Sequence, residues 1–264
     1  MFRFLIYSNI WISIGSALLT YLVYIINDTN PNYNYVGFVF FSTLFSYLLQ
    51  RLVRIKKIAK TSPNSWVVLN KKTAISLLIV SFIGAVFCFS RFYSTNPFIL
   101  YWILILGIVS TGYSVADFRD LPYFKIIMIA SSWGIACGVI HLILIESYEL
   151  NTAILNFGWV FCYILAITIP FDIRDLGIDE ERKKTIPQWV GIKNSKIIAL
   201  LFLLFSILIF GFLSSPLQLM AYIISSFFSG YLIYNSNKNR SDIYFTFLID
   251  GHIIFQFLLI FFLS

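Results

Sequence analysis

Three aspartates carry the first sign of chemistry in this sequence. Asp172, Asp175 and Asp179 stand at positions i, i+3 and i+7 where a long apolar stretch ends. If one helix carries all three, their carboxylates lie on one face and repel each other, and a divalent cation relieves that repulsion. Oxygen ligands suit Mg²⁺, which is commonly held by one or two carboxylates together with substrate phosphates and water. The alternative interpretation is a solvated helix end whose carboxylates pair with neighbouring lysines and arginines.

A second polar cluster follows another apolar stretch. Tyr113 and Ser114 supply hydroxyl groups, while Arg119 and Lys125 supply cationic donors suited to phosphate oxygens. A helix is expected to begin near Pro122, and its first amides would point at the same region. Taken alone, this segment could be an ordinary basic turn between two helices. Together with the aspartates, it indicates a site for Mg²⁺ and a diphosphate.

These residues must be positioned by membrane-spanning helices. The 264 residues are 59% hydrophobic and 12% charged, and their mean hydropathy is +0.84. Soluble globular chains are about 45–50% apolar and about 25% charged, so an ordinary soluble domain is excluded, as are disordered and disulfide-scaffold classes. We predict an all-α polytopic protein that forms a single integral membrane domain over 1–264. Since a crossing needs about 20 apolar residues, about nine spans are expected: 4–26, 35–53, 73–90, 97–115, 123–146, 152–170 (ended by Pro170), 195–213, 216–235 and 242–263.

The distribution of basic residues predicts the orientation in the membrane. With nine spans, every Lys and Arg except Arg91 falls on the same side. The positive-inside rule then places the N-terminus in the cytoplasm and the C-terminus outside. The net charge of +7 therefore reflects topology and attraction to membrane lipids, and we expect no nucleic-acid partner. The wealth of Ile, Phe, Asn and Lys favours a bacterial inner membrane.

The order and spacing of the two polar clusters resemble those of the UbiA superfamily of intramembrane prenyltransferases. The matching segments are Tyr113-Ser114…Arg119-x-Leu121-Pro122-x-x-Lys125, Asp172-x-Arg174-Asp175…Asp179 and Lys184-Thr185-Ile186-Pro187…Gly191. The resemblance implies nine helices around a central cavity, and transfer of a prenyl group from a prenyl diphosphate to an acceptor that is usually aromatic. It implies that the three aspartates bind Mg²⁺. Tyr113, Arg119 and Lys125 would contact the diphosphate, with Lys184 as a further candidate.

One of the two acidic motifs of that family is missing. Its expected place at the end of the second span contains Gln50, Arg51 and Arg54, and no carboxylate occurs between Asp28 and Asp117. Arg51 and Arg54 could replace one Mg²⁺ by pairing directly with diphosphate oxygens, which would preserve charge stabilisation of the leaving group. Alternatively, the protein only binds or transports an isoprenoid or polyprenyl phosphate. The basic run also suits a plain anchor at the membrane surface.

Asp250 lies about eight residues into the last predicted span. An ionisable group at that depth is costly and normally faces the interior of the bundle or water. It could contact the acceptor, pair with a basic residue or act as a general base, and it could equally form a structural interhelical hydrogen bond. The leading hypothesis from the sequence is therefore a Mg²⁺-dependent prenyltransferase. The alternative is a non-catalytic lipid-binding protein on the same scaffold.

Overall fold

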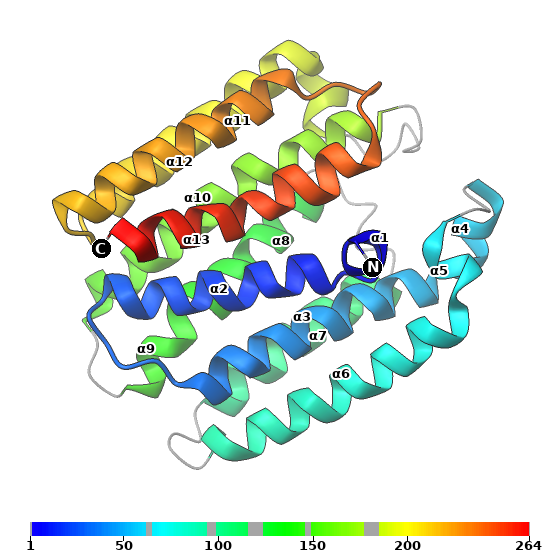
Figure 1. Cartoon of the computed structure of the whole chain (residues 1–264), viewed down its shortest axis with the longest axis horizontal. Coiled ribbons are helices and arrows are strands. Elements are labelled where there is room, and N and C mark those ends of the chain that lie inside the picture. Colours follow the sequence, from blue (N-terminus) through cyan, green and yellow to red (C-terminus); the bar gives the residue numbers. More distant parts are fainter. Residues whose placement is uncertain are drawn as a thin grey trace.

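The computed structural model describes residues 2–61, 65–93, 99–115, 124–145, 149–176 and 185–263. Every regular element in these ranges is a helix, which confirms the all-α prediction (Figure 1). Two short segments, η3 and η5, are π-helical and continue directly into the helices that follow them. The elements are α1 (Phe2–Tyr7), α2 (Ile10–Ile26), α3 (Tyr33–Val53), α4 (Ile55–Thr61), α5 (Trp66–Leu69), α6 (Lys71–Phe92), α7 (Ile99–Val115), α8 (Phe124–Trp133), η3 (Gly134–Val139), α9 (Ile140–Leu144), α10 (Leu150–Arg174), α11 (Ile186–Gly211), α12 (Pro216–Asn235), η5 (Tyr244–Ile249) and α13 (Asp250–Leu263).

The apolar helices coincide with the predicted spans. Within the described ranges, seven helical segments are long and apolar enough to cross a membrane, and α2 and α7 provide two shorter apolar helices. Large apolar side chains also cover the outside of the bundle; Phe227, for example, is 78% exposed. Such a surface suits contact with lipid and not with water. The protein is thus an integral membrane protein with a polytopic helical fold.

The core lies where α2 packs between α13 and α3, and where α10 packs against α8, η3 and α11 (Figure 1). Its largest buried side chains include Trp159 and Tyr163 of α10 and Tyr222 of α12. The Trp159 and Tyr222 rings meet edge to face, with their centroids 6.0 Å apart. This aromatic packing fixes α10, the helix that carries Asp172 and is capped by Asp175, in the middle of the bundle.

Close helix contacts depend on small and amide residues. A Cβ atom added at Gly138 of η3 would lie 2.7 Å from the backbone oxygen of Asn156 in α10. The Asn156 side chain exchanges two amide hydrogen bonds with Asn27 at the end of α2, at 3.1 and 3.2 Å. Together these contacts fix α2, η3 and α10 relative to one another.

The first predicted span is interrupted near Asn9 (φ 67°), which separates α1 from α2. Two other helix boundaries also differ from the prediction. The sixth span does not end at Pro170, because α10 continues through that proline to Arg174. A proline removes only one amide donor, so a helix supported by its neighbours can continue past it. The next helix, α11, begins at Ile186, earlier than the predicted 195. A left-handed residue, Gly191 with φ 78°, separates its first turn from the rest, and glycine adopts that conformation without steric cost.

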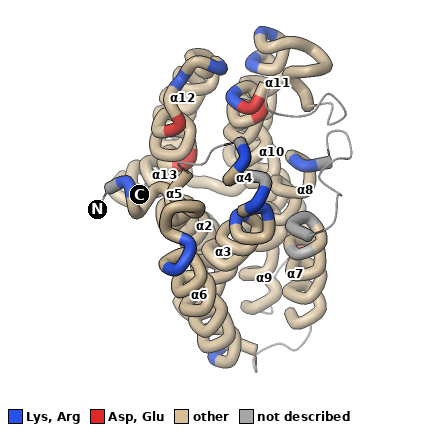
Figure 2. The backbone as a smooth tube through the Cα atoms, turned by 90° about the vertical axis from the view of Figure 1, so that its right-hand side faces the viewer, with Lys and Arg blue, Asp and Glu red and all other residues tan. Residues whose placement is uncertain are grey.

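Basic residues of the described segments gather at one end of the bundle. Figure 2 looks onto this end and shows Lys and Arg on α4, α8 and α11 and on the segment that follows α12. Arg91 lies in the last turn of α6, whereas Lys71 opens that helix, so the two mark its opposite ends. This asymmetry agrees with the expected distribution of charge, while the side on which the cytoplasm lies stays a prediction.

Candidate functional site

The predicted site residues that the structure describes lie at the basic end of the bundle. Lys125 is in the first turn of α8, Asp172 in the last turn of α10, and Asp175 caps α10. Arg51 is in the last turn of α3, and Asp250 opens α13. The backbones of Tyr113 and Ser114 belong to the last turn of α7. Three further predicted residues lie outside the described residues: Arg119, Asp179 and Lys184.

Lys125 and Asp172 form an ion pair across the site. The Lys125 Nζ atom lies 2.5 Å from Asp172 Oδ1, although the residues are 47 positions apart in the chain. The Asp172 side chain is 1% exposed and the Lys125 side chain 15% exposed. The structure thus brings together one residue from each of the two polar clusters. A charge pair this deeply buried is strongly coupled, because little water screens it.

Asp175 is paired with its own neighbour. Arg174 donates two hydrogen bonds to the Asp175 carboxylate, from Nε at 2.8 Å and from Nη2 at 3.3 Å. The guanidinium also lies over the rings of Phe171 and Phe245, at 5.1 and 5.5 Å from their centroids. Its Nη1 atom is 4.0 Å from Asp242 Oδ1. Arg174 therefore acts as a fixed support for Asp175, in agreement with the alternative interpretation, in which the carboxylates pair with neighbouring basic residues.

Arg51 faces the protein interior. Its Nη1 atom donates a hydrogen bond to the backbone oxygen of Tyr7 at 2.7 Å, which ties α1 to the end of α3. Arg51 also lies close enough to Asp250 and Arg174 to interact with both electrostatically. Of the alternatives considered for Asp250, pairing with basic residues therefore finds support in the structure. Arg54 is the C-cap residue of α3 and is half-buried.

The carboxylates of the described residues suit one Mg²⁺ and not a larger cluster. In the ranges that the structure covers, no group of three or more His, Cys, Asp or Glu side chains is placed to hold a metal. Asp172 and Asp175 supply two carboxylates at one helix end, each already paired with a cation. Two carboxylates are enough for one Mg²⁺ when substrate phosphates and water complete its coordination shell. The donor set therefore fits a metal that arrives together with a phosphorylated ligand.

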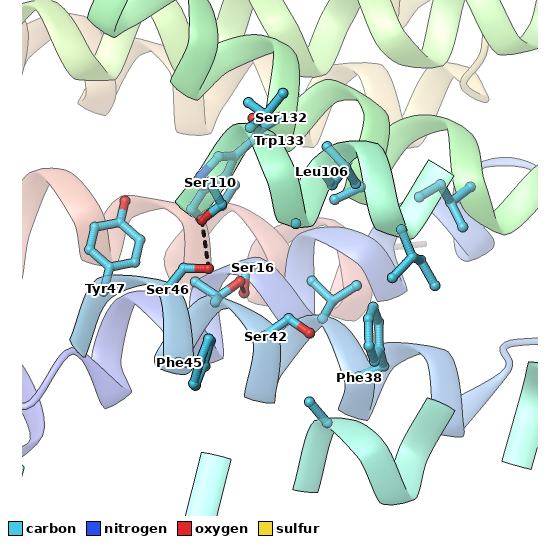
Figure 3. Close-up of a pocket in the computed structure, with 18 of the residues that line it drawn as sticks. Ser16, Phe38, Ser42, Phe45, Ser46, Tyr47, Leu106, Ser110, Ser132 and Trp133 are labelled. Carbon is cyan, nitrogen blue, oxygen red and sulfur yellow. Dashed lines mark hydrogen bonds between the residues drawn. The ribbon is translucent and has the colours of Figure 1, made fainter. Parts of the chain in front are cut away.

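An elongated cavity of about 560 Å³ extends between α3, α6, α7 and α8 (Figure 3). Apolar side chains such as Phe38, Leu106 and Trp133 form most of its wall. Two hydroxyl groups in the wall bond to each other, because Ser110 Oγ of α7 donates to Ser46 Oγ of α3 at 2.9 Å. The two hydroxyl groups thereby satisfy part of each other's hydrogen-bonding capacity, and the wall presents a largely apolar surface to a ligand. Such a cavity suits a hydrocarbon ligand.

Along three wall helices, the cavity wall ends within about one helical turn of predicted polar residues. On α3, its wall extends as far as Gln50, the residue before Arg51. On α8, the wall begins at Met128, three positions after Lys125 and therefore on the same helix face. On α7, it ends at Ser110, one turn before the two predicted hydroxyl residues. On three wall helices, residues predicted to bind the polar head of a ligand thus lie beyond the same end of an apolar cavity.

Comparison with known proteins identifies the fold. No family model and no curated protein sequence matches the chain. A solved UbiA homolog from Archaeoglobus fulgidus, bound to GPP and Mg²⁺, matches 99% of both chains with a TM-score of 0.68 and 12% identity. The same homolog bound to DMAPP and Mg²⁺ covers 98% of both chains (TM-score 0.67, 11% identity). The apo structure of a UbiA homolog from Aeropyrum pernix K1 covers 94% of both chains (TM-score 0.66, 11% identity). The chain therefore has the UbiA fold over nearly its whole length, which confirms the resemblance at the level of the fold.

Proposed function

We propose that this protein is a membrane prenyltransferase that moves a prenyl group from a prenyl diphosphate to an acceptor, with an aromatic acceptor as the leading candidate. The single observation that carries the proposal is the placement of the Lys125–Asp172 pair at one end of an apolar cavity. A ligand that fits both parts must have an anionic head and a long hydrocarbon tail. The solved homologs of the same fold, bound to GPP or DMAPP with Mg²⁺, support this choice of ligand class.

The diphosphate head would bind by replacing Asp172 as the ionic partner of Lys125. In the structure, Lys125 and Asp172 neutralise each other. When a diphosphate arrives, the Lys125 ammonium can move from the carboxylate to a phosphate oxygen, a stronger anionic partner. This move releases the Asp172 carboxylate, which with Asp175 would hold Mg²⁺; Asp179 is proposed to complete this set. When bound, the metal adds positive charge that stabilises the diphosphate as a leaving group.

Tyr113, Ser114, Arg119 and Lys184 are proposed as further contacts to the head. Their residue types match the acceptor-rich surface of a diphosphate, because hydroxyl and cationic groups both donate hydrogen bonds to phosphate oxygens. Arg51 has a different part in this proposal. It is bonded to the Tyr7 carbonyl and interacts with Asp250, so it contributes a fixed positive charge beside the head.

The reaction itself needs a site that excludes water. Cleavage of the bond between carbon and oxygen leaves both electrons on the diphosphate and an allylic cation on the prenyl chain. Tyr47 and Trp133 in the cavity wall can stabilise a cation through the negative faces of their rings. The acceptor then forms the new bond to carbon and loses a proton. Apolar walls prevent capture of the cation by water.

A turnover experiment tests the catalytic proposal. Purified protein in lipid nanodiscs is given a prenyl diphosphate, Mg²⁺ and a panel of aromatic acceptors, and diphosphate release is measured. Asp175→Asn should abolish release while the protein still elutes as a monodisperse species. The matched control is Asp242→Asn, because Asp242 also contacts Arg174 but is 69% exposed; this variant should keep its activity. Full activity in the Asp175 variant, or no release from the wild-type protein, would contradict the proposal.

The residues at the end of α3 favour a second candidate function, which is the binding of a phosphorylated lipid without catalysis. This region presents Gln50 and Arg51 where the superfamily resemblance predicts carboxylates, and Arg51 is already engaged inside the protein. A protein that only binds an isoprenoid or polyprenyl phosphate needs such cations but not a second metal. It would bind its ligand equally well with Mg²⁺ and with a chelator, and it would release no diphosphate.

A further inference from the structure

Aromatic side chains close the end of the cavity that lies far from the charged residues. Tyr35 and Phe38 at the start of α3 and Phe89 near the end of α6 belong to the cavity wall, and Phe92 lies behind them. We refer to these four residues as the aromatic floor. In Figure 3, Phe38 stands at the opposite end of the view from Tyr47, which lies towards the charged end of α3.

The rings of the aromatic floor pack closely against one another. The Phe92 ring meets those of Tyr35, Phe38 and Phe89 with centroid distances of 5.5 Å in each case. Tyr35 and Phe92 are fully buried, and the Tyr35 hydroxyl donates a hydrogen bond to the backbone oxygen of Ala136 in η3. Since α3, α6 and η3 all contribute, one ring cannot move aside without disturbing its neighbours. The floor therefore acts as a fixed wall.

Two wall segments give similar depths for the cavity. From Gln50 to Tyr35 on α3, a helical rise of about 1.5 Å per residue gives roughly 22 Å. From Lys125 to Ile140, the last wall residue on the segment from α8 through η3 to α9, the length is at most roughly 22 Å, because the π-helical residues of η3 rise less per residue than an α-helix. An extended chain advances about 1.2 Å per backbone bond, so four isoprenoid units with four such bonds each cover roughly 19 Å. A tail of this size is also compatible with the cavity volume of about 560 Å³.

We propose that the aromatic floor sets the length of the prenyl chain, so that the preferred diphosphate substrate carries about twenty carbons. The inference rests on the proposed function, because it assumes that the diphosphate head binds at Lys125. A shorter chain leaves apolar wall uncovered and gains less binding energy. A longer chain meets the rings of Phe38 and Phe89 and must bend or leave the cavity. The side of the cavity between α6 and α7 offers one such exit, because Phe82 and Leu104 are exposed there.

The test compares chain lengths in binding experiments at a fixed Mg²⁺ concentration. Non-hydrolysable prenyl thiodiphosphates of ten, twenty and thirty carbons are titrated into the protein in nanodiscs. The wild-type protein should bind the twenty-carbon compound at least tenfold more tightly than either of the others. Phe89→Ala should remove the penalty on the thirty-carbon compound. The control Phe227→Ala removes an equal side chain from the outer surface of α12 and should keep the wild-type order.

The possible outcomes separate the floor from the function. Equal affinity for twenty and thirty carbons in the wild-type protein would overturn the floor proposal and favour the side exit, while leaving the proposed function intact. No binding of any chain would contradict the proposed function, and the floor proposal with it. Should Phe89→Ala fail to fold, Phe38→Leu shortens the floor more gently and is expected to shift the preference in the same direction. Lys125→Met should weaken all three compounds alike, since it acts on the head.

Discussion

The ion pair between Lys125 and Asp172 leads to an asymmetric prediction for stability. Removing one partner of a buried pair costs about 3–5 kcal/mol, because the remaining charge stays buried without compensation. Asp172 is 1% exposed, whereas Lys125 is 15% exposed. In Lys125→Met, the carboxylate has no route to water, and we expect a loss close to that full cost. In Asp172→Asn, the lysine can extend its ammonium towards water, and we expect a loss of only about 1–2 kcal/mol.

Combining the two substitutions separates stability from ligand binding. In the double variant Lys125→Met with Asp172→Asn, no charge is left buried, so much of the loss caused by Lys125→Met should be recovered. All three variants should still lose binding of the thiodiphosphate, because the groups that recognise the head are gone. Reversible unfolding in detergent micelles gives the free energies of unfolding, and calorimetry gives the binding. The reasoning is refuted if Lys125→Met costs less than Asp172→Asn, or if the double variant is no more stable than Lys125→Met.

Three further predictions concern the framework around the site. Gly138→Ala should lower the free energy of unfolding by about 1–3 kcal/mol, because the new methyl group would lie 2.7 Å from the Asn156 backbone oxygen. The control Gly107→Ala should be tolerated, because the space around that position is open. Thermal unfolding of the two variants tests this prediction. Asn27→Ala removes both hydrogen bonds that join the buried Asn156 amide to α2, while the bond from Asn156 to the Thr152 carbonyl remains, and should cost about 1–3 kcal/mol. Asn27→Asp should recover part of this loss, and an unchanged stability of the alanine variant would contradict the role of this contact. Arg51→Met removes the bond to the end of α1, so limited proteolysis should cleave the first helix faster than in the wild-type protein.

The positions of the spans could be predicted from the sequence because the bilayer demands long apolar helices. Their ends could not be predicted as well. Pro170 favours the end of a helix in the sequence, yet α10 continues one turn further because it packs against its neighbours. The early start of α11 has a local signal, because Thr185 and Gln188 form a capping box and Pro187 lies in the first turn, whereas the break at Gly191 depends on a backbone angle. Helix ends in this protein thus depend on both local capping residues and tertiary contacts.

The local spacing of the candidate site residues could be seen in the sequence, whereas their long-range pairing could not. The spacing of Asp172 and Asp175 is local, and a helix brings such residues together at one end. The contact of Asp172 with Lys125 spans 47 positions and depends on how α8 packs on α10. The cavity and its aromatic floor were beyond reach for another reason. In membrane helices, the faces towards lipid and towards the interior are both apolar, so periodicity does not tell Phe38 in the floor from an outer phenylalanine.

The most direct test of the central claim is calorimetric binding of a non-hydrolysable prenyl thiodiphosphate to the purified protein, with Mg²⁺ and with a chelator. The proposed function predicts binding that requires Mg²⁺ and is lost in Asp172→Asn. Binding that is equally tight in the chelator would contradict the metal site and favour the lipid-binding function through basic residues alone. No binding under either condition would leave only the fold in common with prenyltransferases.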